Sequence, residues 1–260
     1  MLFWTKLENR KFDLLKELVK TRFKLRYNNS VLGFVWVLMK PLLSFLILYF
    51  IFTAFRSTGH DPAFAANLFT GLILYYFFQE GVTYGMNSLI DMASVILKIN
   101  FPREIALTSS LVMAGINLVI NFFIIILITL LTGFRPEFTG IVYFGLILLL
   151  LTGFIYGITL FLSILFVKIR DLSNVMELFF QLLFWASAVF YNLDDMQGNT
   201  GAVIRLNPLA IIIDAARKAF IHGEIAHTEY MLGLTLVVLL LIGVGTWFFN
   251  RNIKRIAEFF

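Results

Sequence analysis

The chain has 260 residues, of which 60% are hydrophobic and 14% charged, and it carries a formal net charge of +5 and a mean hydropathy of +0.87. Soluble domains carry roughly 25% charged and about 45–50% apolar residues, so this composition excludes a water-soluble fold. The apolar residues form long runs without strict alternation. Because lipid cannot pair with backbone groups, such runs predict an all-α integral membrane protein.

The first predicted element is an amphipathic helix over residues 3–27. Apolar residues recur there at helical spacing, with basic residues between them: Leu7, Leu14, Leu15, Leu18, Val19 and Leu25. This pattern predicts a helix along the cytoplasmic membrane surface, with its apolar face in lipid and its cations near anionic headgroups. The alternative is a solvated basic leader that only sets the topology.

Six transmembrane helices follow, each long enough to cross a hydrocarbon core about 30 Å thick. They are predicted over residues 31–55, 64–88, 105–131, 139–166, 173–190 and 230–250. The chain then divides as one transmembrane domain. Residues 1–29 form the cytoplasmic interface helix, 30–190 the first five spans, 191–229 an outer gate segment, and 230–260 the last span and a cytoplasmic tail.

Positive charge is concentrated on one side of these spans. The N-terminal segment, the loops with Lys98 and Arg103 and with Lys168 and Arg170, and the tail after residue 250 hold most of the 21 Lys and Arg residues. The opposite side holds five of them: Arg56, Arg135, Arg205, Arg217 and Lys218. Because cytoplasmic loops are enriched in Lys and Arg, both termini are predicted to be cytoplasmic, in a multi-pass protein of the inner (plasma) membrane.

The segment 192–228 is too long for a tight turn and too apolar at its centre for a simple solvated loop. Residues 209–213 form a short apolar run, and Asn207-Pro208 interrupts any helix before it, because proline disfavours helical geometry in the preceding residue. We predict two short outer helices that dip back into the membrane. A seventh, unsuccessful span and an ordinary amphipathic surface helix are the alternatives.

Signatures of soluble enzymes are missing from the sequence. It contains no GxxxxGK[ST] phosphate loop and no cysteine, and His60, His222 and His227 lack metal-ligand spacing. Asp194 and Asp195 are adjacent, and since neighbouring residues point apart on a helix or strand, a solvated turn is favoured over a two-carboxylate site. We therefore predict a chain without catalytic residues, metal, cofactor or ATP site of its own.

Two charged residues, Lys40 and Glu80, fall inside predicted spans, where a charge is costly and usually functional. They suggest a buried ion pair or the polar lining of a pathway; alternatively Lys40 snorkels and Glu80 faces a water-filled cavity. Aromatic rings could line a pathway for sugars, although lipid-facing rings are common. The candidate channel residues are Lys40, Glu80, Tyr76, Tyr84 and Trp185.

Two GxxxG spacings occur within the predicted spans. They pair Gly81 with Gly85 and Gly153 with Gly157. Such spacings allow two helices to approach closely, and packing within the chain is the default interpretation.

The start of the first predicted span carries a longer motif, since residues 26–42 read RYxxSxLGxxWxxxxPL. This segment resembles ABC-2-type polysaccharide exporters, the O-antigen and teichoic acid export permeases. Two further landmarks follow in the same order as in that family, one at residues 98–104 and one at Asn207-Pro208-Leu209 with the later Arg217. The residues of the first motif are Arg26, Tyr27, Ser30, Gly33, Trp36 and Pro41.

The resemblance implies a homodimer of six-helix subunits around a central channel for lipid-linked polysaccharide. Each subunit would pair with an ABC ATPase subunit, two copies in all, which would bind the ATP and Mg. A coupling helix at about residues 88–100 would dock into that ATPase, and the outer helices, with Asn207, Pro208 and Arg217, would form a periplasmic gate. The coupling residues would be Asp91, Lys98, Phe101, Pro102, Arg103 and Glu104.

Membrane lipids are the other expected partners, and nucleic acid is not expected. One alternative is an ABC-2 exporter of drugs or lipids with the same architecture. Another is a membrane enzyme acting on polyprenyl-linked sugars. Such an enzyme would need a cytoplasmic carboxylate or histidine cluster, whereas Asp91, Glu104, Asp171 and Glu177 are dispersed over two loops.

Overall fold

The computed structural model describes residues 2–27, 33, 35–55, 62–93, 102–132, 137–196 and 198–259. Every regular element in these ranges is helical, which confirms the predicted all-α class for the described part of the chain. The long helices are α1 (Leu2–Tyr27), α2 (Val35–Phe55), α3 (Pro62–Asp91), α5 (Glu104–Thr132), α6 (Phe138–Lys168), α7 (Leu172–Ala186) and α10 (Thr228–Asn252). The short ones are η1 (Leu193–Asp195), α8 (Gly198–Ile204), α9 (Pro208–Arg217), the π-helix η2 (Lys218–His222) and η3 (Ile253–Phe259).

Four helical stretches within the described ranges are long and apolar enough to cross a membrane: Val35–Ala54, Glu104–Leu127, Phe138–Lys168 and Thr228–Ile256. They correspond to four of the six predicted spans. Helix α3 has 30 residues, but polar residues such as Gln79 and Asn87 lower its hydropathy. Helix α7 has only 15 residues and ends at Ala186, short of the predicted residue 190. It stops there because Ala188 adopts a left-handed φ of 54°.

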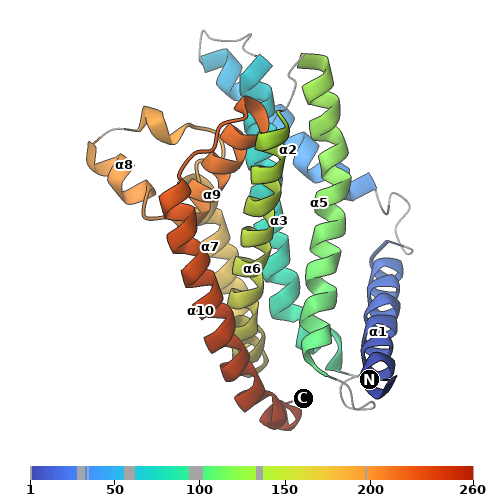
Figure 1. Ribbon diagram of the computed structural model, residues 1–260. Coiled ribbons are helices and arrows are strands. Elements are labelled where there is room, and N and C mark those ends of the chain that lie inside the picture. Colours follow the sequence, from blue (N-terminus) through green and yellow to red (C-terminus); the bar gives the residue numbers. More distant parts are fainter. Residues whose placement is uncertain are drawn as a thin grey trace.

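Helix α3 lies at the centre of the bundle, and α5 and α6 both pack against it, while α10 packs on the far side of α6 (Figure 1). Its middle turns are almost fully buried, including Phe69, Leu72 and Tyr75. Such burial explains why α3 tolerates polar residues: they face protein rather than lipid.

The glycines of both GxxxG spacings lie at helix contacts within the chain, which confirms the default interpretation. A Cβ added at Gly85 would lie 2.3 Å from Cγ2 of Thr159, so α3 and α6 approach closely at this point. On the other side of α6, a Cβ at Gly157 would lie 2.7 Å from the side chain of Leu241 in α10. Small residues therefore set the spacing of α3, α6 and α10.

Helix α1 runs beside the lower part of α5 in Figure 1. Its stripe of Leu14, Leu15, Leu18 and Val19 is half-buried, and Leu18 packs against the core at that end of the bundle. The helix itself matches the prediction. The predicted lipid contact of its apolar stripe differs from the structure, in which the stripe faces the bundle.

Both termini lie at the same end of the bundle, at the bottom of Figure 1. This agrees with the prediction that they share one side of the membrane. We call it the termini end.

Candidate functional site: a polar groove between α2, α3 and α7

A groove of about 560 Å³ lies between α2, α3 and α7. Three of the five predicted channel residues, Lys40, Tyr76 and Trp185, line it. The rest of its lining is a mixture of polar, aromatic and aliphatic side chains: Ser44, Ile47, Leu48, Tyr75, Gln79, Glu177, Phe180, Gln181 and Phe184.

Helical periodicity places these side chains on one face of each helix. On α7, Glu177, Gln181 and Trp185 are spaced four residues apart and therefore form one stripe. On α2, Lys40 and Ser44 have the same spacing. The groove is thus a polar stripe on otherwise apolar helices.

Within the groove, the hydroxyl of Tyr76 donates a hydrogen bond to Ser44 Oγ at 2.8 Å. The Nζ atom of Lys40 lies 5.1 Å from the centroid of the Tyr76 ring, a cation–π contact. Among the described residues no ion pair joins Lys40 to Glu80, so the ion-pair interpretation is wrong. Lys40 is exposed at the groove, and both remaining interpretations, a polar pathway lining and a snorkelling cation, stay predictions.

Glu80 and Tyr84 belong to a different polar contact, between α3, α5 and the end of α1. Asn117 Nδ2 donates to Glu80 Oε2 at 2.7 Å, and the Tyr27 hydroxyl donates to Asn117 Oδ1 at 3.1 Å. The Arg26 guanidinium lies 4.3 Å from the Tyr84 ring centroid. These two predicted channel residues therefore anchor α1 on the bundle.

The remaining residues of the motif at 26–42 are spread along this region. Gly33 has a positive φ of 23°, Trp36 is exposed near the start of α2, and Pro41 is buried inside α2. Ser30 lies outside the described residues.

The predicted coupling residues lie at the termini end of the bundle. Asp91 is the exposed last residue of α3, Pro102 is exposed, and Glu104 is the first residue of α5. The Arg103 guanidinium donates a hydrogen bond to the carbonyl of Ile253. Lys98 and Phe101, with most of the predicted coupling helix, lie outside the described residues, so the coupling role stays a prediction.

The outer segment is built around one buried carboxylate, that of Asp214 in α9, which is only 1% exposed. Its oxygens lie 3.3 Å from Arg217 Nη2, 3.1 Å from Lys218 Nζ and 3.0 Å from His227 Nε2. Lys218 also pairs with Asp194 at 2.6 Å, so Asp194 is not merely part of a solvated turn. We call these five residues the outer ionic cluster.

The contacts within this cluster favour the charged forms of Asp214 and Lys218. Burial alone would raise the pKa of Asp214, but the hydrogen bond from His227 and the charges of Arg217 and Lys218 outweigh it and hold that pKa below its ordinary value. Burial would likewise lower the pKa of Lys218, but its contacts with Asp194 and Asp214 raise that pKa overall. Through Asp214, Lys218 and His227 the cluster joins α9 and η2 to the start of α10.

Asn207 connects the end of α7 to the start of α9. Its Nδ2 atom donates to the carbonyl of Ala186 at 2.9 Å and to Ser187 Oγ at 3.2 Å. Its Oδ1 accepts from the backbone N–H of Leu209 at 3.0 Å, and Pro208 is the first residue of α9. The two predicted short outer helices are present as α8 and α9, and α9 is buried along its length from Leu209 onward.

Some residues of these sites were not singled out from the sequence. Asp214 was missed, although it precedes Arg217 and Lys218 by three and four residues, the spacing of helical ion pairs. Asn117 was missed although it interrupts an apolar run. Glu177 was noted only as one of four dispersed carboxylates.

Four apolar helices of membrane length in the described part of the chain define a multi-pass membrane protein, with a groove of mixed polarity between α2, α3 and α7 and a buried ionic segment at one end. Within the described ranges, no group of His, Cys, Asp or Glu could hold a metal ion. Residues 13–221 match the family described as ABC-2 type transporter. The chain belongs to this family of membrane proteins, which confirms the resemblance at residues 26–42.

Three similar proteins of nearly the same length are named as export or transport proteins. The chain is 31% identical over 247 residues to an "O-antigen export system permease protein RfbA" of Klebsiella pneumoniae, covering 95% of each chain. It is 26% identical to a protein of the same description from Myxococcus xanthus, covering 94% of each. It is also 23% identical to the "Polysialic acid transport protein KpsM" of Escherichia coli, covering 88% of this chain and 92% of that one.

Proposed function

We propose that this chain is the channel-forming membrane subunit of an ATP-driven exporter that moves lipid-linked, O-antigen-like polysaccharide from the cytoplasm across the inner membrane. In this proposal α3 and α7 complete a set of six spans with the four apolar helices. At 1.5 Å per residue, the 30 residues of α3 extend about 45 Å, enough to cross. Both termini are then cytoplasmic, and α8, α9 and the outer ionic cluster face the periplasm as a gate segment.

The polar groove carries this proposal. Sugars combine hydroxyl groups with apolar ring faces, and they need a surface that offers hydrogen bonds and flat rings together. Lys40, Gln79, Glu177 and Gln181 supply the polar groups, and Tyr76 and Trp185 are among the rings. The names of these relatives, which concern O-antigen and polysialic acid, point to the same class of cargo.

A homodimer would enclose this groove. The helices on its two sides expose large apolar residues, among them Trp36 and Phe50 on α2 and Leu182 on α7. A second copy covering these faces would turn an open groove into a channel. Since the sequence has no phosphate loop, a separate ABC ATPase subunit, two copies per dimer, would bind ATP and Mg and supply the energy.

The direct test is a strain that lacks this chain. We expect finished lipid-linked polysaccharide to accumulate at the cytoplasmic leaflet and to disappear from the cell surface, and the intact chain to restore it. Unchanged surface polymer would contradict the proposed cargo. The function to test next would then be export of drugs or lipids by a member of the same family.

Replacing Trp185 tests the groove. We expect Trp185→Ala to lower the rate of polymer export roughly threefold to tenfold, as for the loss of one aromatic contact worth about 1 kcal/mol. Trp247→Ala is the matched control, because Trp247 on α10 is 60% exposed and Trp185 57%, and Trp247 lies outside the groove. Export is measured as surface polymer over time. Equal export by the two variants would show that Trp185 does not line the pathway.

Replacing Pro102 tests the coupling. We expect Pro102→Ala to reduce export strongly while the thermal unfolding midpoint changes little, because Pro102 is exposed and lies outside the helical bundle core. The measurements are polymer export and polymer-dependent ATP hydrolysis by the purified complex. Normal complex formation together with normal export would contradict the assignment of residues 88–104 to coupling.

A further inference from the structure

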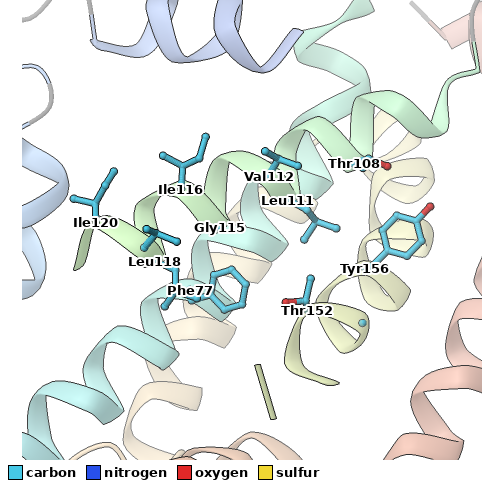
Figure 2. Close-up of a pocket in the computed structure, with 12 residues that line it drawn as sticks. Phe77, Thr108, Leu111, Val112, Gly115, Ile116, Leu118, Ile120, Thr152 and Tyr156 are labelled. Carbon is cyan, nitrogen blue, oxygen red and sulfur yellow. The ribbon is translucent and has the colours of Figure 1, made fainter. Parts of the chain in front are cut away.

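A second and larger groove, of about 830 Å³, lies between α5 and α6 with Phe77 of α3 beneath it (Figure 2). It exists because α5 and α6 each pack extensively on α3 but touch each other little. On α5, its lining recurs at helical spacing through Thr108, Leu111, Gly115 and Val119. Apart from three side-chain hydroxyls, the lining is apolar.

The position of this groove separates it from the polar groove. On α3, Phe77 lines the apolar groove, whereas Tyr75 and Gln79 line the polar one. Two residues along a helix correspond to a rotation of about 200°, so the two grooves lie on opposite faces of α3. The apolar groove is therefore turned away from the proposed polymer pathway and toward the surrounding membrane.

The dimensions and polarity of the groove fit one chain of a lipid. From Thr108 to Ile120 it follows thirteen residues of α5, a rise of about 18 Å, which is a little more than half of a hydrocarbon core about 30 Å thick. The hydroxyls of Thr108 and Tyr156 mark one end of it in Figure 2. Further along α5, the groove has free space beside Gly115, where an added Cβ would meet nothing within 4 Å.

Charge complementarity identifies the headgroup. The hydroxyl end of the groove lies at the termini end of the bundle, one turn from Glu104, whose carbonyl accepts a hydrogen bond from Thr108 Oγ1 at 3.0 Å. A separate cavity of about 450 Å³ begins there, and two cations, Arg103 and Lys254, line it with the single carboxylate of Glu104. An excess of positive charge at the cytoplasmic leaflet attracts anionic headgroups.

We propose that the α5–α6 groove is a binding site for an anionic phospholipid of the leaflet at the termini end, with one acyl chain along α5 and its phosphate toward Arg103 and Lys254. The bound chain fills the space that α5 and α6 leave over Phe77. It thereby supports the packing of both helices on α3. This site is independent of the polymer pathway.

The test uses the full chain, purified in mild detergent from membranes that contain phosphatidylglycerol and phosphatidylethanolamine. Native mass spectrometry then counts the phospholipid retained per chain. We expect about one for the unmodified chain, and roughly tenfold less retained lipid for Gly115→Phe, because the ring occupies the space in which several methylene groups are buried. Gly145→Phe is the matched control. A Cβ added at Gly145 would also meet nothing within 4 Å, but Gly145 lies on α6 outside the groove.

Retention of lipid by Gly115→Phe, or equal loss in Gly145→Phe, would overturn the site. So would a changed oligomeric state of Gly115→Phe with unchanged lipid content, which would assign the groove to a second copy. If Gly115→Phe does not fold, Val119→Ser replaces it, with Val142→Ser as its control. Val119 and Val142 are both exposed, and only Val119 lines the groove.

A third variant tests the headgroup. We expect Lys254→Gln to lower the ratio of retained phosphatidylglycerol to phosphatidylethanolamine severalfold, whereas Arg255→Gln, which alters an exposed neighbour outside the cavity, leaves the ratio unchanged. An unchanged ratio in Lys254→Gln would overturn the proposed orientation of the lipid. Because surface polymer is scored separately, these outcomes are distinguishable from failure of the export proposal.

Discussion

Replacing Asp214 by Asn should destabilise the protein more than any other single polar substitution proposed for it. The Asp214 carboxylate is 1% exposed and neutralises Arg217, which is itself buried and, among the described residues, otherwise bonds only to the carbonyl of Tyr191 at 2.9 Å. Removing one partner of a buried ion pair costs about 3–5 kcal/mol, because the other charge stays buried. We expect the thermal unfolding midpoint in detergent to fall by about 10 °C or more.

Asp195→Asn is the matched control, because Asp195 is an exposed carboxylate in the same outer segment, and it should change the midpoint little. The double variant Asp214→Asn with Arg217→Gln should be less destabilised than the sum of the two single changes, because it removes both charges. Additive effects would show that the two side chains do not interact.

The stabilisation by Asp214 should depend on pH in a defined direction. A carboxylate whose pKa is lowered in the folded state stabilises it fully above the unfolded value of about 3.9, and this contribution is lost as pH falls through the folded pKa. The pKa of Lys218 is raised in the folded state, so its contribution to stability is complete below the unfolded value of about 10.4. This contribution is lost as pH rises through the folded pKa. Below pH 4 the difference in stability between the unmodified chain and Asp214→Asn should shrink.

The second large effect is expected at the crossing of α3 and α6. Gly85→Val places new atoms into Thr159, which is fully buried and cannot move aside, at a point where a Cβ would already lie 2.3 Å from Thr159 Cγ2. Overpacking of this kind costs about 1–3 kcal/mol or more. We expect less folded protein in the membrane and an unfolding midpoint lower by about 5 °C or more.

Gly243→Val controls for the change in helix propensity, because a Cβ at Gly243 on α10 would meet nothing within 4 Å. Exchanging the small residue across the contact provides a rescue. Gly85→Ala combined with Thr159→Gly should be more stable than Gly85→Ala alone, since the glycine is restored on the opposite helix. A Gly85→Val protein as stable as Gly243→Val would show that α3 and α6 do not touch here.

The outer segment shows where sequence reasoning reached the right element but not its chemistry. The Asn207-Pro208 pair predicted an interruption of any helix at that point, and α9 begins there because the signal is local: Asn207 caps Leu209, two residues away. The role of Asp214 was not predicted, because its partners include His227 and, through Lys218, Asp194, which are distant along the chain. A fold must bring such residues together before their charges can interact.

Lys40 and Glu80 show the same difference between what the sequence indicates and what the fold determines. Both were recognised as charges inside apolar segments, since that property is written in the sequence. Their partners depend on how α2, α3 and α5 are rotated about their axes. In the structure Lys40 of α2 lies against the Tyr76 ring, and Glu80, one turn further along α3, accepts a hydrogen bond from Asn117 of α5.

The sequence by itself determined the membrane class, the approximate helix bounds and the family motif, because each depends on composition, hydrophobic run length or local spacing. Tertiary structure alone decided that α7 ends at Ala186, that the stripe of α1 faces the bundle, and that the polar and apolar grooves lie on opposite faces of α3. Helix rotation and close packing fix these features, and they arise from contacts between residues far apart in the chain.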